Sequence, residues 1–103
     1  MIFYELNETV NANTLTSTNT LEVRSCEALI MYVIGRSGSH KNHIVKLETS
    51  PNNFDWMPYE IEISGNGCGK SMDIDFLKYV RASVTTVEGA ESEIEIYIQA
   101  ISR

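Results

Sequence analysis

The chain has 103 residues, of which 43% are hydrophobic, a length and composition typical of one globular domain and unlike those of a disordered chain. Its net charge of −6 argues against nucleic-acid binding, because phosphate backbones require clustered Lys and Arg and the eight basic residues here are scattered. No apolar run approaches the roughly 18 residues of a membrane span. The N-terminal sequence lacks the features of a secretory signal, so we expect a cytoplasmic origin, the alternative being a chain that has already been processed.

The first twenty residues differ from the rest of the chain. A short apolar patch at 2–6 is followed by a stretch rich in Asn and Thr, residue types that favour turns and extended backbone. We therefore divide the chain into an N-terminal extended arm or edge strand, residues 1–20, and a β-sandwich domain, residues 21–103.

Residues 28–34 (ALIMYVI) form the longest apolar run, and its length suits a strand. Both faces of such a strand would be apolar, so it is either covered on both sides or carries an interface on one. We assign one face to the candidate core, namely Leu29, Met31 and Val33. We assign the other face to a candidate interface, namely Ala28, Ile30, Tyr32 and Ile34. Tyr97, on the outward side of the last strand, joins this interface because Tyr is favoured at protein contacts.

The sequence from residue 43 to residue 101 predicts four strands separated by short connections. The strands are expected at 43–49, 57–64, 78–87 and 92–101, with a turn at 50–56, a glycine-rich loop at 65–75 and a turn at 88–91. Period-two alternation in the last two strands adds six residues to the candidate core: Val80, Ala82, Val84, Ile94, Ile96 and Ile98.

Two further features lie between these strands. Trp56 follows the 50–56 turn and is expected to cap the core, the alternative being an exposed platform for a sugar. The best helix candidate is a short turn within 71–80, with Ser71 as its N-cap. The whole pattern predicts an all-β chain, a single antiparallel β-sandwich of jelly-roll or immunoglobulin-like type, with about seven or eight strands and little helix.

No motif predicts catalysis or a cofactor. Residues 69–71 (GKS) match the end of a phosphate-binding loop, but Ser64 stands where that motif requires glycine. The row of Glu91, Glu93 and Glu95 is interpreted as a solvated strand edge, since acid–base catalysis needs one carboxyl in a dry pocket. We expect no catalytic residue, no cofactor-binding residue and therefore no enzyme.

Metal binding and disulfide formation are not expected either. His40 and His43 have no cysteine or carboxylate cluster beside them, which makes a poor zinc site. Two cysteines, Cys26 and Cys68, are too few for a disulfide framework. We expect two free thiols in a reducing compartment, with a single bridge as the alternative.

Two segments of the chain resemble small β-sandwich modules of tailed-phage virions. These are VKLETSPNNFDW (45–56) and YVRASVTTV (79–87), followed by a closing strand that ends in IQAI. In that family a strand leads into Ser-x-Asp-Gly-x-x-Trp and a later strand carries Tyr-x-Arg-Ala. The residues that match are Ser50, Trp56, Tyr79, Arg81 and Ala82, while Asn-Asn at 52–53 replaces Asp-Gly and keeps the turn chemistry. The similarity covers about residues 27–101.

The resemblance implies an accessory structural protein of the virion with no catalytic residues. The most specific expectation is a capsid decoration (cement) protein on the outer capsid surface, made in the host cytoplasm, that bridges coat subunits. Its partners would be the major capsid protein or other virion proteins and further copies of itself, with a trimer as one form, and neither nucleic acid nor a membrane.

A carbohydrate- or receptor-binding module associated with a tail or fibre is the alternative, because the Ser-to-Trp turn also resembles discoidin-type domains. Glycan would then contact exposed aromatic residues and the loops at 35–42 and 64–72.

Overall fold

The computed structural model describes the backbone of the chain except for residues 13, 39–42, 87–91 and 103, and the side chains of these residues and of residues 37, 38, 86 and 92 are not described. Over the described residues the chain forms nine strands and no helix. His40, Glu91, part of the 35–42 loop and the 88–91 turn lie outside this description. The predicted all-β antiparallel sandwich is confirmed, and nine strands are described where about seven or eight were expected, two of them only two residues long.

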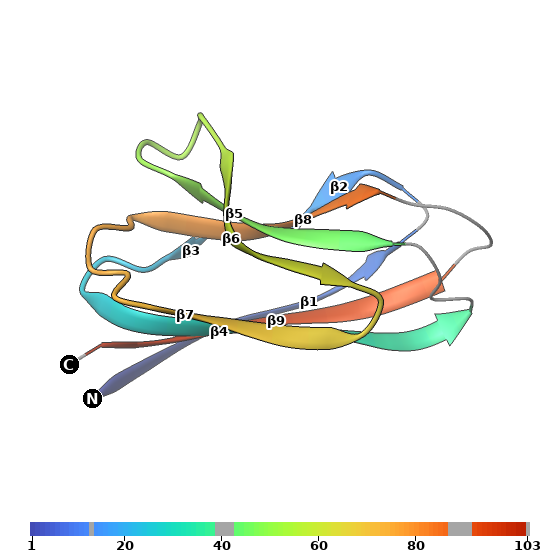
Figure 1. The fold of residues 1–103 in the computed structure, drawn as a ribbon, viewed down its shortest axis with the longest axis horizontal. Helices are drawn as coiled ribbons and strands as arrows, with labels where there is room; N and C mark the ends of the chain where they lie inside the picture. Colours follow the sequence, from blue (N-terminus) through green and yellow to red (C-terminus); the bar gives the residue numbers. More distant parts are fainter. Residues whose placement is uncertain (13, 39–42, 87–91, 103) are drawn as a thin grey trace.

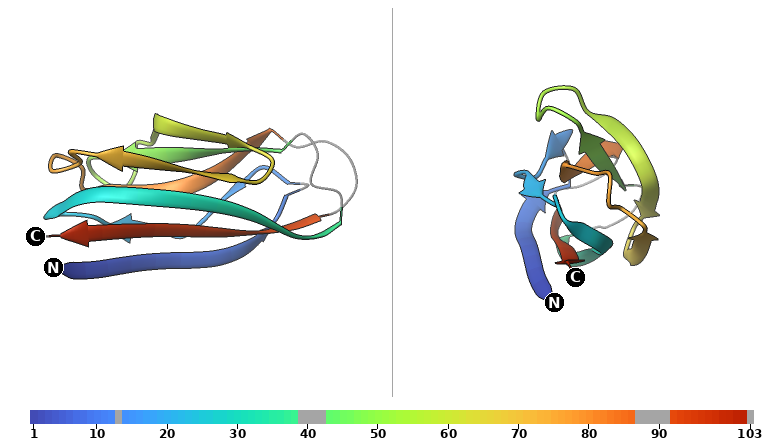
Figure 2. Two further views of the ribbon diagram at one scale, coloured as in Figure 1. Left: turned by 60° about the horizontal axis from the view of Figure 1, so that its bottom comes forward. Right: turned by 90° about the vertical axis from the view of Figure 1, so that its left-hand side faces the viewer.

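The strands form two antiparallel sheets that pack face to face (Figure 1, Figure 2). The four-stranded sheet has the order β1 (Ile2–Asn11), β9 (Ser92–Ser102), β4 (Cys26–Gly38) and β7 (Gly67–Met72). The five-stranded sheet has the order β2 (Thr16–Ser17), β8 (Tyr79–Thr86), β5 (Ile44–Ser50) and β6 (Met57–Ser64), with β3 (Leu21–Glu22) also paired to β8. The molecule measures 41 × 26 × 18 Å, and its two termini lie at the same end (Figure 1).

The core lies between the two sheets and is made by inward-facing side chains, which occur at every second position along the strands. Along β9, the side chains at every second position are fully buried, namely Ile94, Ile96, Ile98 and Ala100. The other aliphatic residues assigned to the core from the sequence are buried as well: Leu29, Met31, Val33, Val80, Ala82 and Val84. Each large side chain removed from water contributes about 1.5–3 kcal/mol, so these positions dominate the stability of so small a domain.

Trp56 lies outside this core, in contrast to the sequence expectation. Its side chain is half-buried, and the Arg81 guanidinium lies 4.2 Å from the centroid of its ring. The 50–56 turn rises above the sheet (Figure 1), and Trp56, at the end of this turn, is not among the residues of the core. A cation–π contact therefore takes the place of burial.

The predicted loop at 65–75 is wrong in its central part, which is strand β7. A Cβ atom added at Gly69 would lie 2.9 Å from Cγ2 of Ile61, and one added at Gly67 would lie 3.2 Å from Cγ2 of Ile63. The two glycines therefore allow β7 to pass close to the buried isoleucines of β6 rather than marking an irregular loop.

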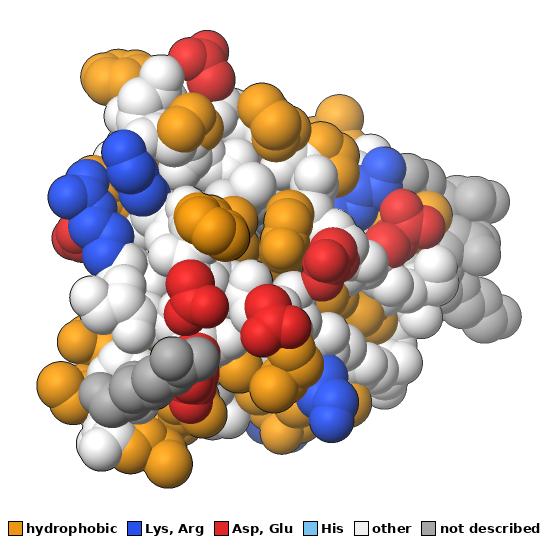
Figure 3. Space-filling view, turned by 60° about the vertical axis from the view of Figure 1, so that its left-hand side comes forward, with side chains coloured by type: hydrophobic (Ala, Val, Ile, Leu, Met, Phe, Trp, Pro, Cys, Tyr) orange, Lys and Arg blue, Asp and Glu red, His pale blue; other side chains and the backbone are white. Residues whose placement is uncertain are grey.

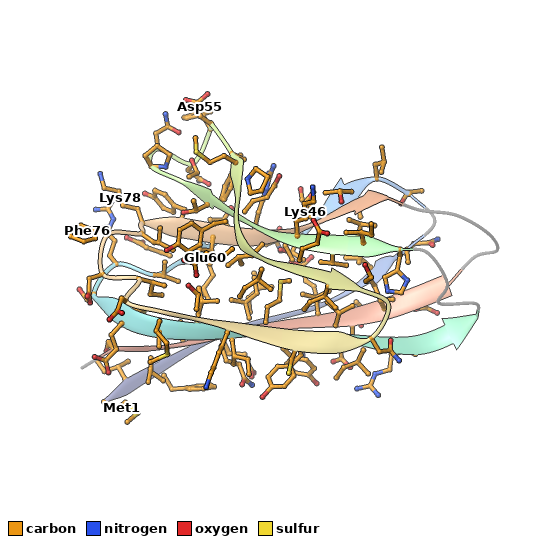
Figure 4. All side chains as sticks on the ribbon, viewed as in Figure 1. Met1, Lys46, Asp55, Glu60, Phe76 and Lys78 are labelled. Carbon is orange, nitrogen blue, oxygen red and sulfur yellow. The ribbon has the colours of Figure 1, made fainter. Side chains whose placement is uncertain are left out.

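The predicted helical turn with Ser71 as its cap is also wrong, because Ser71 belongs to β7 and is 2% exposed. Its hydroxyl donates a hydrogen bond to Oε2 of Glu60, with an oxygen–oxygen distance of 2.5 Å. Glu60 has a left-handed backbone (φ 56°), beside the register shift between β5 and β6, and is exposed at the side of the sandwich where the edge strands β6 and β7 run next to each other (Figure 4). This contact joins β6 of one sheet to β7 of the other.

Candidate functional site

The outer face of the four-stranded sheet carries an unusual number of large apolar and aromatic side chains. Strand register places Tyr32 of β4 directly opposite Tyr97 of β9, and their rings meet edge to face with centroids 6.3 Å apart. Further apolar and amide residues lie on the same side of neighbouring strands. We call this surface the aromatic face and define it by Phe3, Ile30, Tyr32, Ile34, Met72, Tyr97, Gln99 and Ile101.

Two shallow hollows lie side by side on the aromatic face. The first has a volume of about 250 Å³ and is lined by Tyr32, Ile34, Tyr97 and Gln99. The second, of about 160 Å³, shares Gln99 with the first and is lined also by Ala28, Leu29, Ile30, Lys70, Met72 and Ile101. The Gln99 amide donates to the Glu5 carboxylate of β1 at 2.7 Å, which fixes the side chain that separates the hollows.

A polar cluster borders the aromatic face beside the first hollow. Nε of Arg36 donates to Oε1 of Glu95 at 2.8 Å, and a second guanidinium nitrogen lies 2.6 Å from the same oxygen. The hydrogen bond from Arg36, followed by one from Tyr97, lowers the pKa of Glu95 below its usual range. The bond to Glu95 in turn raises the pKa of the Tyr97 hydroxyl. These contacts hold the Tyr97 ring in a defined orientation on the face.

This cluster corrects the interpretation of the glutamate row as a solvated strand edge. Strand β9 lies between β1 and β4, inside the sheet, and the Glu95 side chain is only 17% exposed. Glu93 of the same strand is exposed.

The outer face of the five-stranded sheet has a different character. It carries two ion pairs, between Arg81 and Glu48 at 2.8 Å and between Lys46 and Glu62 at 3.6 Å. Lys46 lies on this upper layer in Figure 4, opposite Ser83 of β8 in the register. In Figure 3 hydrophobic side chains are spread over this end of the molecule, from its upper to its lower margin, with Asp and Glu side chains among them. The two outer faces thus differ in emphasis: aliphatic and aromatic side chains surround the Tyr32–Tyr97 pair on one, and two ion pairs mark the other.

The 50–56 turn presents an exposed aromatic residue away from the aromatic face. The Ser50 hydroxyl accepts hydrogen bonds from the backbone amides of Asn52 and Asn53, and the Asn52 side-chain oxygen accepts from those of Phe54 and Asp55. Asp55 marks the tip of this turn in Figure 4. Because side-chain bonds fix the backbone, the Phe54 ring is held 85% exposed.

The structure brings the candidate interface residues of the sequence together. Ile30, Tyr32, Ile34 and Tyr97 share the aromatic face, and Ala28, 8% exposed, lies in the floor of the second hollow. Sequence reasoning missed Gln99 and Ile101, although the alternation that placed Tyr97 outward continues to them. It also missed Phe3, Met72 and the Arg36–Glu95 pair, which depend on strand pairing and on recognising β7.

The remaining sequence candidates lie elsewhere. His43 is buried, with Nε2 3.1 Å from the Gly65 carbonyl oxygen. Cys26 is buried and Cys68 exposed, and both are free thiols. Across the described ranges, no group of three or more His, Cys, Asp or Glu side chains is arranged to hold a metal ion. No helix in this part of the chain has the length and apolar character needed to cross a membrane.

Comparison with known proteins supplies a family and a fold. A family model described as a domain of unknown function, DUF6385, matches residues 22–102. Comparison with curated proteins gave no match. The chain is similar to the crystal structure of the SPBc2 prophage-derived protein YomS, with a TM-score of 0.62 and 17% identity over 95% of this chain and 96% of that one. It is also similar, with a TM-score of 0.47 and 9% identity, to a chain from a structure described as "Bacillus endospore appendages form a novel family of disulfide-linked pili", over 98% of this chain and 89% of that one. The likeness to YomS shows a shared sandwich fold.

Proposed function

We propose a structural and non-enzymatic role in a tailed-phage particle for this chain. The chain belongs to the DUF6385 family of domains of unknown function. More specifically, we propose a decoration protein on the outer capsid surface. It would bridge neighbouring coat subunits through the aromatic face and leave the charged face of the five-stranded sheet in solvent.

The contrast between the two outer faces carries this proposal. Tyr, Met and Phe are enriched at protein interfaces, whereas charged residues are depleted from interface centres. The aromatic face holds residues of the first kind around the Tyr32–Tyr97 pair, while the opposite face is built around the Arg81–Glu48 and Lys46–Glu62 ion pairs. Adhesion through the four-stranded sheet would therefore bury the surface that gains most from losing water.

The size of the whole outer face of the four-stranded sheet, which includes the aromatic face, suits a specific contact. Four strands about 4.8 Å apart, with about ten residues at 3.4 Å each, cover about 600 Å². A stable protein interface buries about 800 Å² on each partner, so this face supplies most of one. A binding free energy of only about 5–8 kcal/mol per site would be enough for tight attachment if several linked sites bound one capsid lattice at the same time.

Two other observations support a position on the exterior of a phage particle. The net charge of −6 disfavours contact with packaged nucleic acid. YomS, a solved structure that shares this fold, is described as prophage-derived, which agrees with the sequence resemblance to virion modules.

Mass spectrometry of purified particles tests the proposal at the level of the particle. We expect the chain to be present at a fixed copy number relative to the coat protein. Its absence from intact particles of the phage that encodes it would contradict the proposal.

A pair of variants tests the face that binds. Tyr97→Lys places a cation on the aromatic face beside Glu95, and Ser83→Glu places an anion on the opposite face across from Lys46, so each new charge has a counter-charge in its own chain. We expect Tyr97→Lys to lose binding to particles that lack the protein and Ser83→Glu to retain it. The reverse result would show that the five-stranded sheet is the binding side.

Receptor or carbohydrate binding is a second candidate, favoured by Phe54, whose ring is exposed on the 50–56 turn and whose backbone amide donates a hydrogen bond to the Asn52 side chain. A glycan array with the wild-type chain, Phe54→Ala and Trp56→Ala tests this role. Binding that both variants lose would favour it, and no binding to any glycan would count against it.

A further inference from the structure

The sandwich has four strand edges in its described part, and three of them carry features that prevent pairing with another chain. Strand β6 contains Pro58 and lies beside the register shift at Glu60. Strand β7 is six residues long and contains Lys70. On the remaining side of the five-stranded sheet, β2 and β3 are two residues long. Proline, lysine, irregular register and short length are the usual means by which edge strands avoid unwanted pairing.

Strand β1, the fourth edge, has none of these features. All ten of its residues pair with β9 without a register shift, and its sequence IFYELNETVN contains no Pro, Lys or Arg. Its two carboxylates are already used within the chain, since Glu5 accepts from Gln99 and Glu8 accepts from the backbone amide of Asn19. A long, regular strand with no free charge directed at a partner presents an open row of backbone donors and acceptors.

We propose that β1 pairs antiparallel with β1 of a second copy of this chain, about a two-fold axis at Leu6, to join two four-stranded sheets into one. An axis at Leu6 keeps each inward residue opposite an inward residue and each outward residue opposite an outward one. Opposite pairs in this register are Ile2 with Val10, Phe3 with Thr9, Tyr4 with Glu8, and Glu5 with Asn7.

The strand is complementary to itself in this register. No two like charges face each other, and an acidic residue always faces a neutral hydrogen-bonding one. Because β1 forms one margin of the aromatic face, the pairing joins two aromatic faces into one continuous surface. The inference concerns the isolated chain and goes beyond the proposed function, since it holds or fails whatever surface the dimer binds.

Sedimentation of the full chain, compared with two variants of one residue, tests the pairing. Wild type is expected at twice the chain mass of 11.6 kDa. Asn7→Glu sets its new carboxylate against Glu5 of the other copy at two places across the axis, and should raise the dimer dissociation constant about tenfold. Asn7→Lys sets two opposite-charge pairs at the same places and should keep the dimer. Both variants lose the contact of Asn7 with Glu95, and within each chain the new carboxylate repels Glu95 while the new ammonium attracts it, so the melting temperatures are measured to separate this effect on folding from the effect on the dimer.

Disulfide cross-linking tests the register between the two β1 strands directly. In a Cys68→Ser background, Glu5→Cys mixed with Asn7→Cys should form a disulfide-linked dimer on oxidation, whereas each variant alone should not, because opposite residues lie within disulfide reach only in the mixture. A wild-type chain that stays monomeric at its highest soluble concentration would overturn the inference. A dimer that Asn7→Glu leaves unchanged and that gives no mixed disulfide would also overturn it. If Tyr97→Lys abolished such a dimer, the contact would lie on the aromatic face.

Discussion

Glu60 shows how one residue with a left-handed backbone can join the two layers of the sandwich. A side chain in this conformation costs about 1–2 kcal/mol relative to ordinary backbone. Its carboxylate accepts a hydrogen bond from the hydroxyl of Ser71, a residue that is buried. A hydrogen bond to a charged group contributes about 1.5–3 kcal/mol, so the contact offsets the backbone conformation.

Three substitutions separate these two contributions. Glu60→Ala keeps the left-handed backbone and leaves the Ser71 hydroxyl without this acceptor, so the free energy of unfolding should fall by about 1–3 kcal/mol. Glu60→Gly loses the same bond but relaxes the backbone, and should be about 1 kcal/mol more stable than Glu60→Ala. Glu60→Gln retains an acceptor and should lie nearest to wild type. Urea unfolding measures all three, and equal stabilities of the Ala and Gly variants would contradict the role of the backbone.

The Arg36–Glu95 pair predicts a dependence of stability on acid pH. The pKa of Glu95 is lower in the folded chain than in the unfolded chain, so the pair stabilises the fold above the unfolded pKa. That stabilisation is lost as the pH falls through the folded pKa. Arg36→Gln should therefore be less stable than wild type at neutral pH, and the difference should shrink in acid. Urea midpoints at neutral and acidic pH check this, and a difference that stays constant with pH would contradict it.

At the scale of the element, β9 organises the four-stranded sheet. It pairs with β1 along one side and β4 along the other, and its inward isoleucines are fully buried. Ile96→Asp would bury a carboxylate at the centre of this core, and we expect no folded protein. Ile96→Val, which removes one methylene, should cost only about 0.5–1.5 kcal/mol. Circular dichroism and thermal melting compare the two, and a soluble Ile96→Asp chain with an unchanged melting temperature would refute the assignment.

The β6–β7 connection depends on close packing at glycine. Gly69→Ala puts a methyl group 2.9 Å from Cγ2 of Ile61 and should lower stability by about 1–3 kcal/mol. Gly67→Ala, at 3.2 Å from Ile63, should cost less. Gly69→Ala should cost less stability in a chain that already carries Ile61→Ala than it costs in wild type, because the shorter side chain removes the clash. Thermal melting of the four chains tests this order, and equal losses at the two glycines would contradict it.

Much of the element order follows from local sequence. The alternation of Ile94, Ile96 and Ile98 with polar residues indicates one buried face, and the apolar run at 28–34 indicates a strand with two covered or contacting faces. Strand β7 could not be predicted in this way, because glycine usually marks a loop and its close approach to Ile61 is a tertiary contact. The aromatic face was predicted in part from β4 and Tyr97. Its other members, such as Met72 and Phe3, depend on which strands become neighbours, and sequence periodicity does not specify strand order.

At the scale of the whole molecule, the sandwich is asymmetric. The four-stranded sheet presents an outer face centred on aromatic and aliphatic side chains with the Arg36–Glu95 pair at its border, and the five-stranded sheet presents two ion pairs. The open edge of β1 belongs to the first sheet, so lateral pairing would enlarge the apolar surface and not the charged one. A protein that adheres by one side and faces water on the other gains from this arrangement.

Reconstruction of the intact particle at side-chain resolution tests this adhesive role most directly. The expected result is that Tyr32, Tyr97 and their neighbours on the aromatic face are buried against a coat subunit, while Arg81 and Lys46 face solvent. A reconstruction in which the aromatic face lies in open solvent, or in which the chain contacts its neighbours only through the five-stranded sheet, would contradict it.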